Sequence, residues 1–202
     1  MGIVLARLVE LNTALTALDV RKNSFGVRCA AAFARCLERD CSALRTLHLS
    51  ANPLCGVRHE CGTYDPSGML ALATALTLNT TLRTLNLAST RLGLVGYQPL
   101  LACLRSGPSS LTKLTSLGLS SNGLGCKGGV ALATALEGNT SLRRLDLASN
   151  AIGAEGGACL AKLLELSTAL TRLDLRSNDL RACIGAFQLA LEVRGAEAEL
   201  RL

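Results

Sequence analysis

Aromatic residues are scarce in this sequence. Its 202 residues include three Phe, two Tyr and no Trp, although 49% of the chain is apolar. A compact core of mixed side chains normally uses more rings than this, whereas a core built from many similar layers of leucine does not need them. The composition therefore favours a repetitive architecture, and the length fits one domain.

Long apolar runs and clusters of basic residues are absent as well. Charged residues interrupt every apolar stretch before it reaches the roughly 20 residues of a membrane-spanning helix. Arg7 and Glu10 break the first stretch too early for a secretory leader. The net charge of +6 is spread along the chain, without a basic stripe or an aromatic stacking platform. We therefore expect no membrane insertion and no nucleic-acid binding.

Cysteine, in contrast, is abundant. The chain contains nine cysteines, an odd number that leaves at least one thiol unpaired. In a sequence without a secretion signal, such cysteines are normally reduced thiols. The sequence therefore predicts a cytoplasmic protein, with a nuclear or other intracellular assembly as the alternative.

One pattern, L-x-x-L-x-L-x-x-N, recurs six times and is the signature of leucine-rich repeats. The copies begin at Leu15, Leu44, Leu82, Leu114, Leu142 and Leu170, with spacings of 29, 38, 32, 28 and 28 residues. The alternating leucines predict a strand with one face inward. Apolar residues at helical spacing, as in 158–166, predict a helix in each unit. Glycines at 125, 128 and 129 recur at 153, 156 and 157, which indicates a tight loop opening each helix.

The last position of the pattern predicts a structural ladder. Asparagine occupies it in five units, at Asn23, Asn52, Asn122, Asn150 and Asn178. We expect these amides to bond the backbone of adjacent turns, which closes buried polar groups. Thr90 is the departure, and because a hydroxyl can make only part of an amide's bonds, we expect a local weakness there. Two glycosylation sequons, at Asn79 and Asn139, share one repeat position and are interpreted as by-products of the repeat.

The period of 28 residues with a helix in every unit resembles the ribonuclease-inhibitor-like class of leucine-rich repeats. That class includes the repeat regions of intracellular immune sensors and of Ran GTPase-activating proteins. The resemblance spans about residues 3–202. It implies an α/β fold in one domain, 1–202: a right-handed solenoid with a parallel sheet on its concave face and helices on its convex face. Function follows only weakly from fold. The resemblance implies a non-catalytic protein-interaction scaffold or adaptor, or a structural subunit of a larger assembly. A GTPase regulator of the Ran-activating kind is the first alternative.

Both ends of the chain look like parts of repeats. Residues 5–11 match the helix residues 160–166, and Leu200–Leu202 fits the start of a seventh strand. Neither end shows the polar capping unit that solenoids normally need. Our hypothesis is that other chains, another copy or further sequence cover these ends.

The segment 55–65 is an insertion with possible chemistry. Cys55, His59 and Cys61 could supply three zinc ligands, with Asp65 or Glu60 as the fourth. Cys55 and Cys61 could equally form a reversible disulfide, so a metal or redox sensor is the second alternative function. A solvated loop with incidental cysteines is the favoured interpretation.

The repeat pattern explains the residues that resemble a catalytic or cofactor-binding motif. Gly123 to Gly128 has the spacing G-x-G-x-x-G of nucleotide-binding loops. Equivalent glycines recur one period later, however, so they are interpreted as a feature of the repeat. A solenoid also lacks the crossover that forms a dinucleotide crevice. Neither histidine has a nucleophile at a recognisable spacing. We therefore expect no enzyme activity and no cofactor.

Outward strand positions form the predicted binding surface, with solvated strand residues as the alternative interpretation. The candidates are Arg45, His48, Arg83, Asn86, Arg143, Arg144, Asp146, Arg172, Asp174 and Arg176. Arginine is favoured at interfaces, and its planar fork suits carboxylates. Receptors of the ribonuclease-inhibitor type tend to carry Trp or Tyr here, and this chain carries none, which favours a modest, polar interaction. Tyr64 and Tyr97 lie near the two insertions and mark a rival docking surface.

Overall fold

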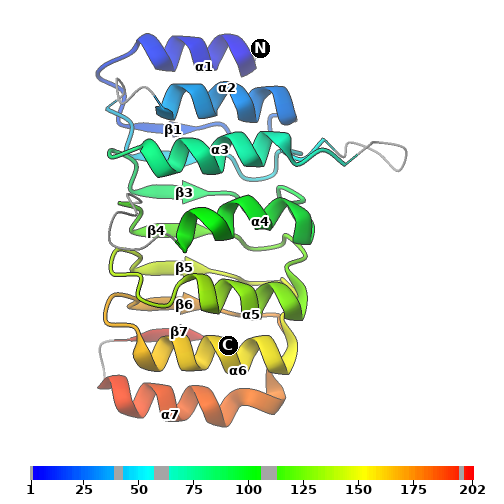
Figure 1. Ribbon diagram of the computed structural model, residues 1–202, viewed down its shortest axis with the longest axis vertical. Helices are drawn as coiled ribbons and strands as arrows, with labels where there is room; N and C mark the ends of the chain where they lie inside the picture. Colours follow the sequence, from blue (N-terminus) through cyan, green and yellow to red (C-terminus); the bar gives the residue numbers. More distant parts are fainter. Residues whose placement is uncertain (1, 39–42, 57–63, 106–112, 196–197) are drawn as a thin grey trace.

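The computed structural model describes residues 2–38, 43–56, 64–105, 113–195 and 198–202, in which helices alternate with short strands (Figure 1). The strands are β1 (Ala17–Asp19), β2 (Thr46–His48), β3 (Thr84–Asn86), β4 (Ser116–Gly118), β5 (Arg144–Asp146), β6 (Arg172–Asp174) and β7 (Glu199–Arg201). The helices are α1 (Gly2–Leu11), α2 (Val27–Glu38), α3 (Ser67–Leu78), α4 (Gly93–Leu104), α5 (Gly125–Ala135), α6 (Gly153–Leu166) and α7 (Ile184–Arg194), with a 3₁₀ turn, η1 (Arg181–Cys183), before α7. Each of the first six strands starts two residues after a predicted repeat start.

All seven strands form one parallel sheet in chain order. Their central leucines lie in register from Leu18 in β1 to Leu200 in β7. Parallel neighbours require a crossover connection, and here each crossover carries a helix. The helices form one layer on a single side of the sheet (Figure 1). This is the α/β leucine-rich-repeat solenoid that the sequence predicts, with one face of the sheet left open.

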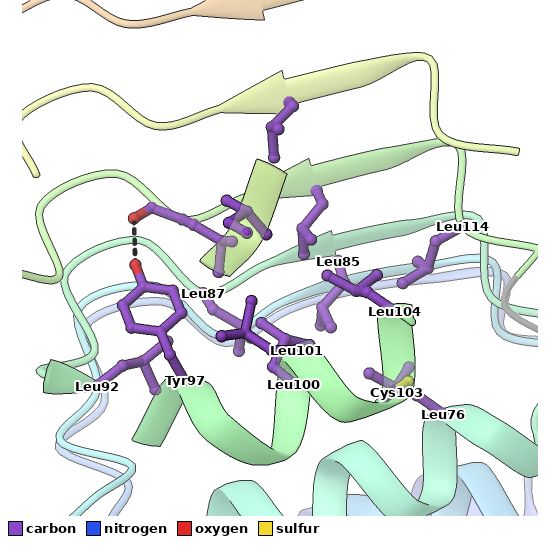
Figure 2. Close-up of a cluster of buried hydrophobic side chains, with 14 of the residues drawn as sticks. Leu76, Leu85, Leu87, Leu92, Tyr97, Leu100, Leu101, Cys103, Leu104 and Leu114 are labelled. Carbon is purple, nitrogen blue, oxygen red and sulfur yellow. Dashed lines mark hydrogen bonds between the residues drawn. The ribbon is translucent and has the colours of Figure 1, made fainter. Parts of the chain in front are cut away.

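Leucines from the strands and helices form one continuous core. The central leucines of β2 to β6 are at most 1% exposed, so each repeat contributes a similar apolar layer. Larger gaps between layers are filled by a few rings, among them Phe33, Tyr97 and Phe187. Tyr97 is fully buried and its hydroxyl donates to the Leu119 carbonyl at 3.3 Å (Figure 2). The prediction that Tyr97 marks a docking surface is therefore wrong, because this ring packs inside the solenoid.

The asparagine ladder is confirmed at four of its five predicted positions, whereas the fifth, Asn23, donates its side-chain amide only to the carbonyls of Val20 and Arg21 in its own turn. Asn150 Oδ1 accepts the backbone N–H groups of Asn122 at 3.0 Å and Leu124 at 3.3 Å. Its Nδ2 donates to the carbonyls of Leu147 in its own turn, at 2.9 Å, and Leu119 in the preceding turn, at 3.0 Å. The same four bonds are made by each of Asn52, Asn122 and Asn178. One buried amide thus links the backbones of two successive turns.

Thr90 replaces this link with a weaker one. Its hydroxyl donates to the carbonyl of Leu87, in its own turn, at 2.6 Å. A hydroxyl has a single hydrogen, so Thr90 cannot also donate to the preceding turn as the asparagines do. The hydroxyl thus supplies fewer donors than the amide would. Its effect on stability stays a prediction, which the Discussion takes up.

The residues on either side of the ladder position adopt left-handed backbone conformations. Ser149 and Ala151 flank Asn150 with φ of 55° each. Such conformations cost a residue with a Cβ roughly 1–2 kcal/mol, and the repeat pattern did not predict them. Two residues further on, Gly153 has φ of 67° and the matching Gly125 has 69°. This confirms the predicted tight loop at the start of the helix.

Both sequon asparagines have a structural role. Asn79 is 3% exposed, and its Oδ1 accepts the N–H groups of Thr81 at 3.1 Å and Leu82 at 2.7 Å. Its Nδ2 donates to the carbonyl of Leu37, one unit earlier, at 2.8 Å. Asn139 accepts the equivalent pair of N–H groups. The two sequons thus belong to a second structural column, between each helix and the next strand.

The outer face of α1 is apolar and exposed. Val4 is 64% exposed and Leu8 is 60% exposed, whereas Leu163, the counterpart of Leu8 in α6, is 5% exposed. This face of α1 therefore lacks the packing that α6 has, and what covers it stays a prediction. Among the described residues, no helix has the length and apolar content needed to cross a bilayer.

Candidate functional site on the concave face

We call the side of the sheet away from the helices the concave face. Each strand presents its first and third residues there, since the central leucine points inward. The first positions are Ala17, Thr46, Thr84, Ser116, Arg144, Arg172 and Glu199, and the third are Asp19, His48, Asn86, Gly118, Asp146, Asp174 and Arg201. From β2 to β4 these positions hold hydroxyls, an imidazole, an amide and a glycine. From β5 to β7 every one of them is charged.

A shallow groove of about 270 Å³ runs over this face from β2 to β7. It brings together six of the predicted residues: His48, Asn86, Arg144, Asp146, Arg172 and Asp174. It also includes Thr84, Ser116, Gly118 and Arg201, which were not among the predicted site residues. Gly118 also lines the groove, and the Asn86 amide lies against it, since a Cβ added at Gly118 would stand 3.0 Å from Asn86 Oδ1.

The other predicted arginines lie outside the groove: Arg45, Arg83, Arg143 and Arg176. The first three each precede their strand by one residue, and so fall outside the two columns. Arg83 is moreover engaged with its own repeat, since its Nη1 donates to the carbonyls of Thr80 at 2.9 Å and Thr81 at 3.0 Å. The sequence pattern located the face but did not resolve which outward positions converge on it.

Ion pairs neutralise most of the charge on β6 and β7. Arg176 pairs with Asp174 at 2.7 Å, and both Arg172 and Arg201 pair with Glu199. Hydrogen bonds from Arg176 hold the pKa of Asp174 below its usual value. Hydrogen bonds from Arg172 and then Arg201 lower the pKa of Glu199 in the same way. At neutral pH these carboxylates are therefore ionised and paired within the chain.

Acidic and amide side chains in the third position also hold the backbone. Asp146 Oδ1 accepts the N–H of Ala148 at 3.0 Å, and Asn86 Oδ1 accepts that of Ala88 at 2.9 Å. Asp19 and Asp174 make the same bond two residues ahead. Short polar side chains characteristically form such local bonds. Part of the predicted binding surface thus has a structural role that outward spacing alone did not indicate.

The insertion after β2 carries the metal and redox hypotheses. Cys55 is fully buried, and this burial raises the pKa of its thiol. Tyr64 donates its hydroxyl to the carbonyl of Leu92, which ties the end of the insertion to the next repeat. His59 and Cys61 lie outside the described residues. Within the described part of the chain, no three His, Cys, Asp or Glu side chains are grouped as a metal site.

A larger groove, of about 370 Å³, separates the ends of α5 and α6. It exists because α5 ends at Ala135 while α6 continues to Leu166. Its lining is mainly apolar, and its cation, Lys162, pairs with Glu165 of the same helix at 3.0 Å. We prefer the concave groove as the candidate site because charged groups from several strands converge there.

These features define a leucine-rich-repeat solenoid with an open, polar sheet face. A family model described as Leucine Rich repeat matches residues 78–101, 110–133 and 138–161. The C-terminal domain of tropomodulin from Caenorhabditis elegans has a similar structure, with a TM-score of 0.57 and 15% identity over 96% of this chain and 93% of that one. A structure of leiomodin-1 actin-binding site 2 gives a TM-score of 0.50 and 19% identity over 93% and 86%. No curated protein matches the sequence. These likenesses are of fold, and the ribonuclease-inhibitor-like class stays a prediction.

Proposed function

We propose that this chain is a non-catalytic protein-interaction module, acting as a scaffold or adaptor or as a subunit of a larger assembly, and that it binds its partner across the concave face. One observation carries the proposal. The helices cover a single side of the sheet, and the other side gathers polar side chains from β2 to β7 into one groove. Small-molecule pockets are usually deeper and mostly apolar, whereas a broad polar face suits another protein.

The composition of the groove sets the kind of interaction. Arginine is enriched at protein interfaces, but the aromatic anchors that dominate tight complexes are missing from both columns. A modest affinity is therefore expected. None of the seven described cysteines forms a disulfide, which supports an intracellular location. Actin is the first partner to test, because the leiomodin-1 structure of similar fold is an actin-binding site.

The test adds bulk and charge to the groove and compares the result with the same change elsewhere. In the test variant, Thr84→Arg and Ser116→Arg fill the groove. In the control, Ala154→Arg and Ala158→Arg add the same charge to exposed positions of α6. Binding to actin is measured by co-sedimentation, and binding to other proteins by quantitative capture from native extract.

A partner held by the wild type and the control, but lost by the groove variant, supports binding across the concave face. Retention by the groove variant would show that the interaction uses another surface. Circular dichroism and thermal unfolding of each variant establish that the fold is retained.

A further inference from the structure

Two neighbouring strands carry the same charged residues in different surroundings. Both β5 and β6 read Arg-Leu-Asp, with Arg144 opposite Arg172 and Asp146 opposite Asp174. Arg172 in β6 is paired with Glu199 of β7. The residue in register with Arg144 on the following strand is Arg172. Arg144 therefore has a like charge at the position where Arg172 has a carboxylate. Arg144 is exposed and forms no ion pair with any carboxylate in the described part of the chain.

Asp146 differs from Asp174 in the same direction. Asp174 is neutralised by Arg176, but the equivalent position after β5 is Ala148. Asp146 instead accepts the hydroxyl of Ser120 at 3.0 Å through Oδ2 and a backbone N–H through Oδ1. Its oxygens are thus occupied by neutral donors, and they leave Arg144 available.

The strand beside Arg144 carries only small residues on this face. In the sheet register, Arg144 lies opposite Ser116, and Asp146 lies opposite Gly118. A Cβ added at Gly118 would lie 3.0 Å from Asn86 Oδ1, so a larger residue there would push against that amide and crowd the groove. Arg144 itself has the short side chain of Ser116 as its neighbour on β4, which leaves its guanidinium open to a partner on that side.

We propose that this groove binds an acidic segment of a partner protein, and that one Asp or Glu of the segment pairs with Arg144 above Ser116. The proposal rests on the proposed function, because it names the chemistry by which the concave face selects a partner. A guanidinium fork and a carboxylate form two parallel charge-assisted hydrogen bonds. Asp146 repels a second carboxylate on the Gly118 side, so a single acid is selected, on the Ser116 side.

The far end of the groove holds His48 of β2. It lies three strands from β5, roughly 14 Å at a spacing of about 4.8 Å per strand. An extended chain covers that distance in about four residues at roughly 3.4 Å each. A segment that lies along the groove from Arg144 to His48 therefore needs about four residues beside its acid.

The experiment selects peptides of 12 random residues, displayed on phage, against immobilised wild-type protein. Asp or Glu should be enriched at one position of the selected peptides. Selection on Arg144→Glu should instead enrich Lys or Arg. A selected acidic peptide is then synthesised and its affinity measured by fluorescence anisotropy. We expect Arg144→Gln to weaken binding about tenfold, whereas the matched Arg172→Gln, whose arginine already has a partner, should change it less than about threefold.

Other outcomes distinguish a failure of this proposal from a failure of the proposed function. Selected peptides without acidic enrichment, or equal losses in the two glutamine variants, would overturn the role of Arg144. If Gly118→Asn still abolished binding of those peptides, the concave face would remain the binding site. Peptides insensitive to Gly118→Asn and to both glutamine variants would show that the groove is not a binding surface at all, and the proposed function would fail with it.

Discussion

The turns at Asn150 and at Thr90 occupy the same place in two repeats but are held differently. At Asn150 one amide group bonds the backbones of its own turn and the turn before it. At Thr90 the single hydroxyl hydrogen is used within its own turn. The surrounding cores are alike, since the central leucines Leu145 and Leu85 are 1% and 0% exposed. The difference teaches that apolar layers and polar links are separate sources of stability in this solenoid.

Removing the amide from the stronger turn should have the largest effect. Asn150→Ala leaves two buried N–H groups, of Asn122 and Leu124, without their acceptor. Each unsatisfied buried group costs roughly 1–3 kcal/mol, so we expect a loss of about 4 kcal/mol in the free energy of unfolding, measured in urea. Asn150→Thr, which copies the Thr90 turn, should lose about half as much. Equal losses from the two variants would mean that a hydroxyl contributes nothing at this position.

Truncation of a buried leucine in each repeat tests whether the two repeats differ in packing. Leu145→Ala and Leu85→Ala should each lower the free energy of unfolding by about 3 kcal/mol, within the range of roughly 2–5 kcal/mol for buried leucines. The two losses should agree within about 1 kcal/mol, because the burial is the same. A much smaller loss at Leu85 would place the weakness of that repeat in its core rather than in its turn.

Restoring the ladder should strengthen the weaker turn. Thr and Asn have similar volumes, so Thr90→Asn can add the missing donor to the preceding turn without overpacking. We expect a gain of about 1 kcal/mol, close to the net value of one buried hydrogen bond. The gain is read from the urea midpoint at an unchanged slope. A destabilised variant would show that the turn has adapted its shape to threonine.

Relieving backbone strain should help both turns equally. Ser89 and Ser149 precede the two ladder positions, are both exposed, and share a φ of 55°. Replacing either by glycine removes the left-handed penalty but increases the freedom of the unfolded chain. We expect a net gain of about 0.5 kcal/mol from each, seen as a small rise in Tm. A clearly larger gain at Ser89 would reveal additional strain at the Thr90 turn.

Acid should affect the two kinds of repeat differently, and this is the smallest effect. The strand before Thr90 ends in the neutral Asn86, whereas the strand before Asn178 ends in Asp174, whose pKa Arg176 lowers. A carboxyl with a lowered folded pKa contributes stability above its unfolded pKa, near 3.8, and loses that contribution as the pH falls through the folded pKa. Because Arg176 is largely exposed, the contribution should be below about 0.5 kcal/mol.

The check is a carboxyl titration by NMR together with unfolding at pH 3 and pH 7. Arg176→Gln should raise the pKa of Asp174 towards its usual value and should remove the small acid-dependent loss of stability. Arg144→Gln is the control, because Arg144 makes no pair with a carboxylate in the described structure, and it should leave the Asp174 titration unchanged.

Most of the fold was predictable because it repeats. The spacing of Leu-x-x-Leu-x-Leu predicted the strands and their inward faces, and the recurring asparagine predicted the ladder. The role of Tyr97 could not be predicted in that way, since it departs from the repeat and its burial depends on the gap between two particular layers. The left-handed serines also escaped prediction, because the turn imposes their conformation against their own preference.

The sequence by itself determined the period, the element order and the chemistry of the ladder, because each follows from local spacing and side-chain type. Only the tertiary structure decided which outward residues share the groove, because convergence depends on sheet register. Register brings Gly118 beside Asp146, and within the described residues it gives Arg144 no carboxylate to pair with, although Arg144 and Arg172 stand in the same local sequence, Arg-Leu-Asp. Their difference comes from residues one repeat away, since Arg172 has Glu199 as its neighbour and Arg144 has Arg172.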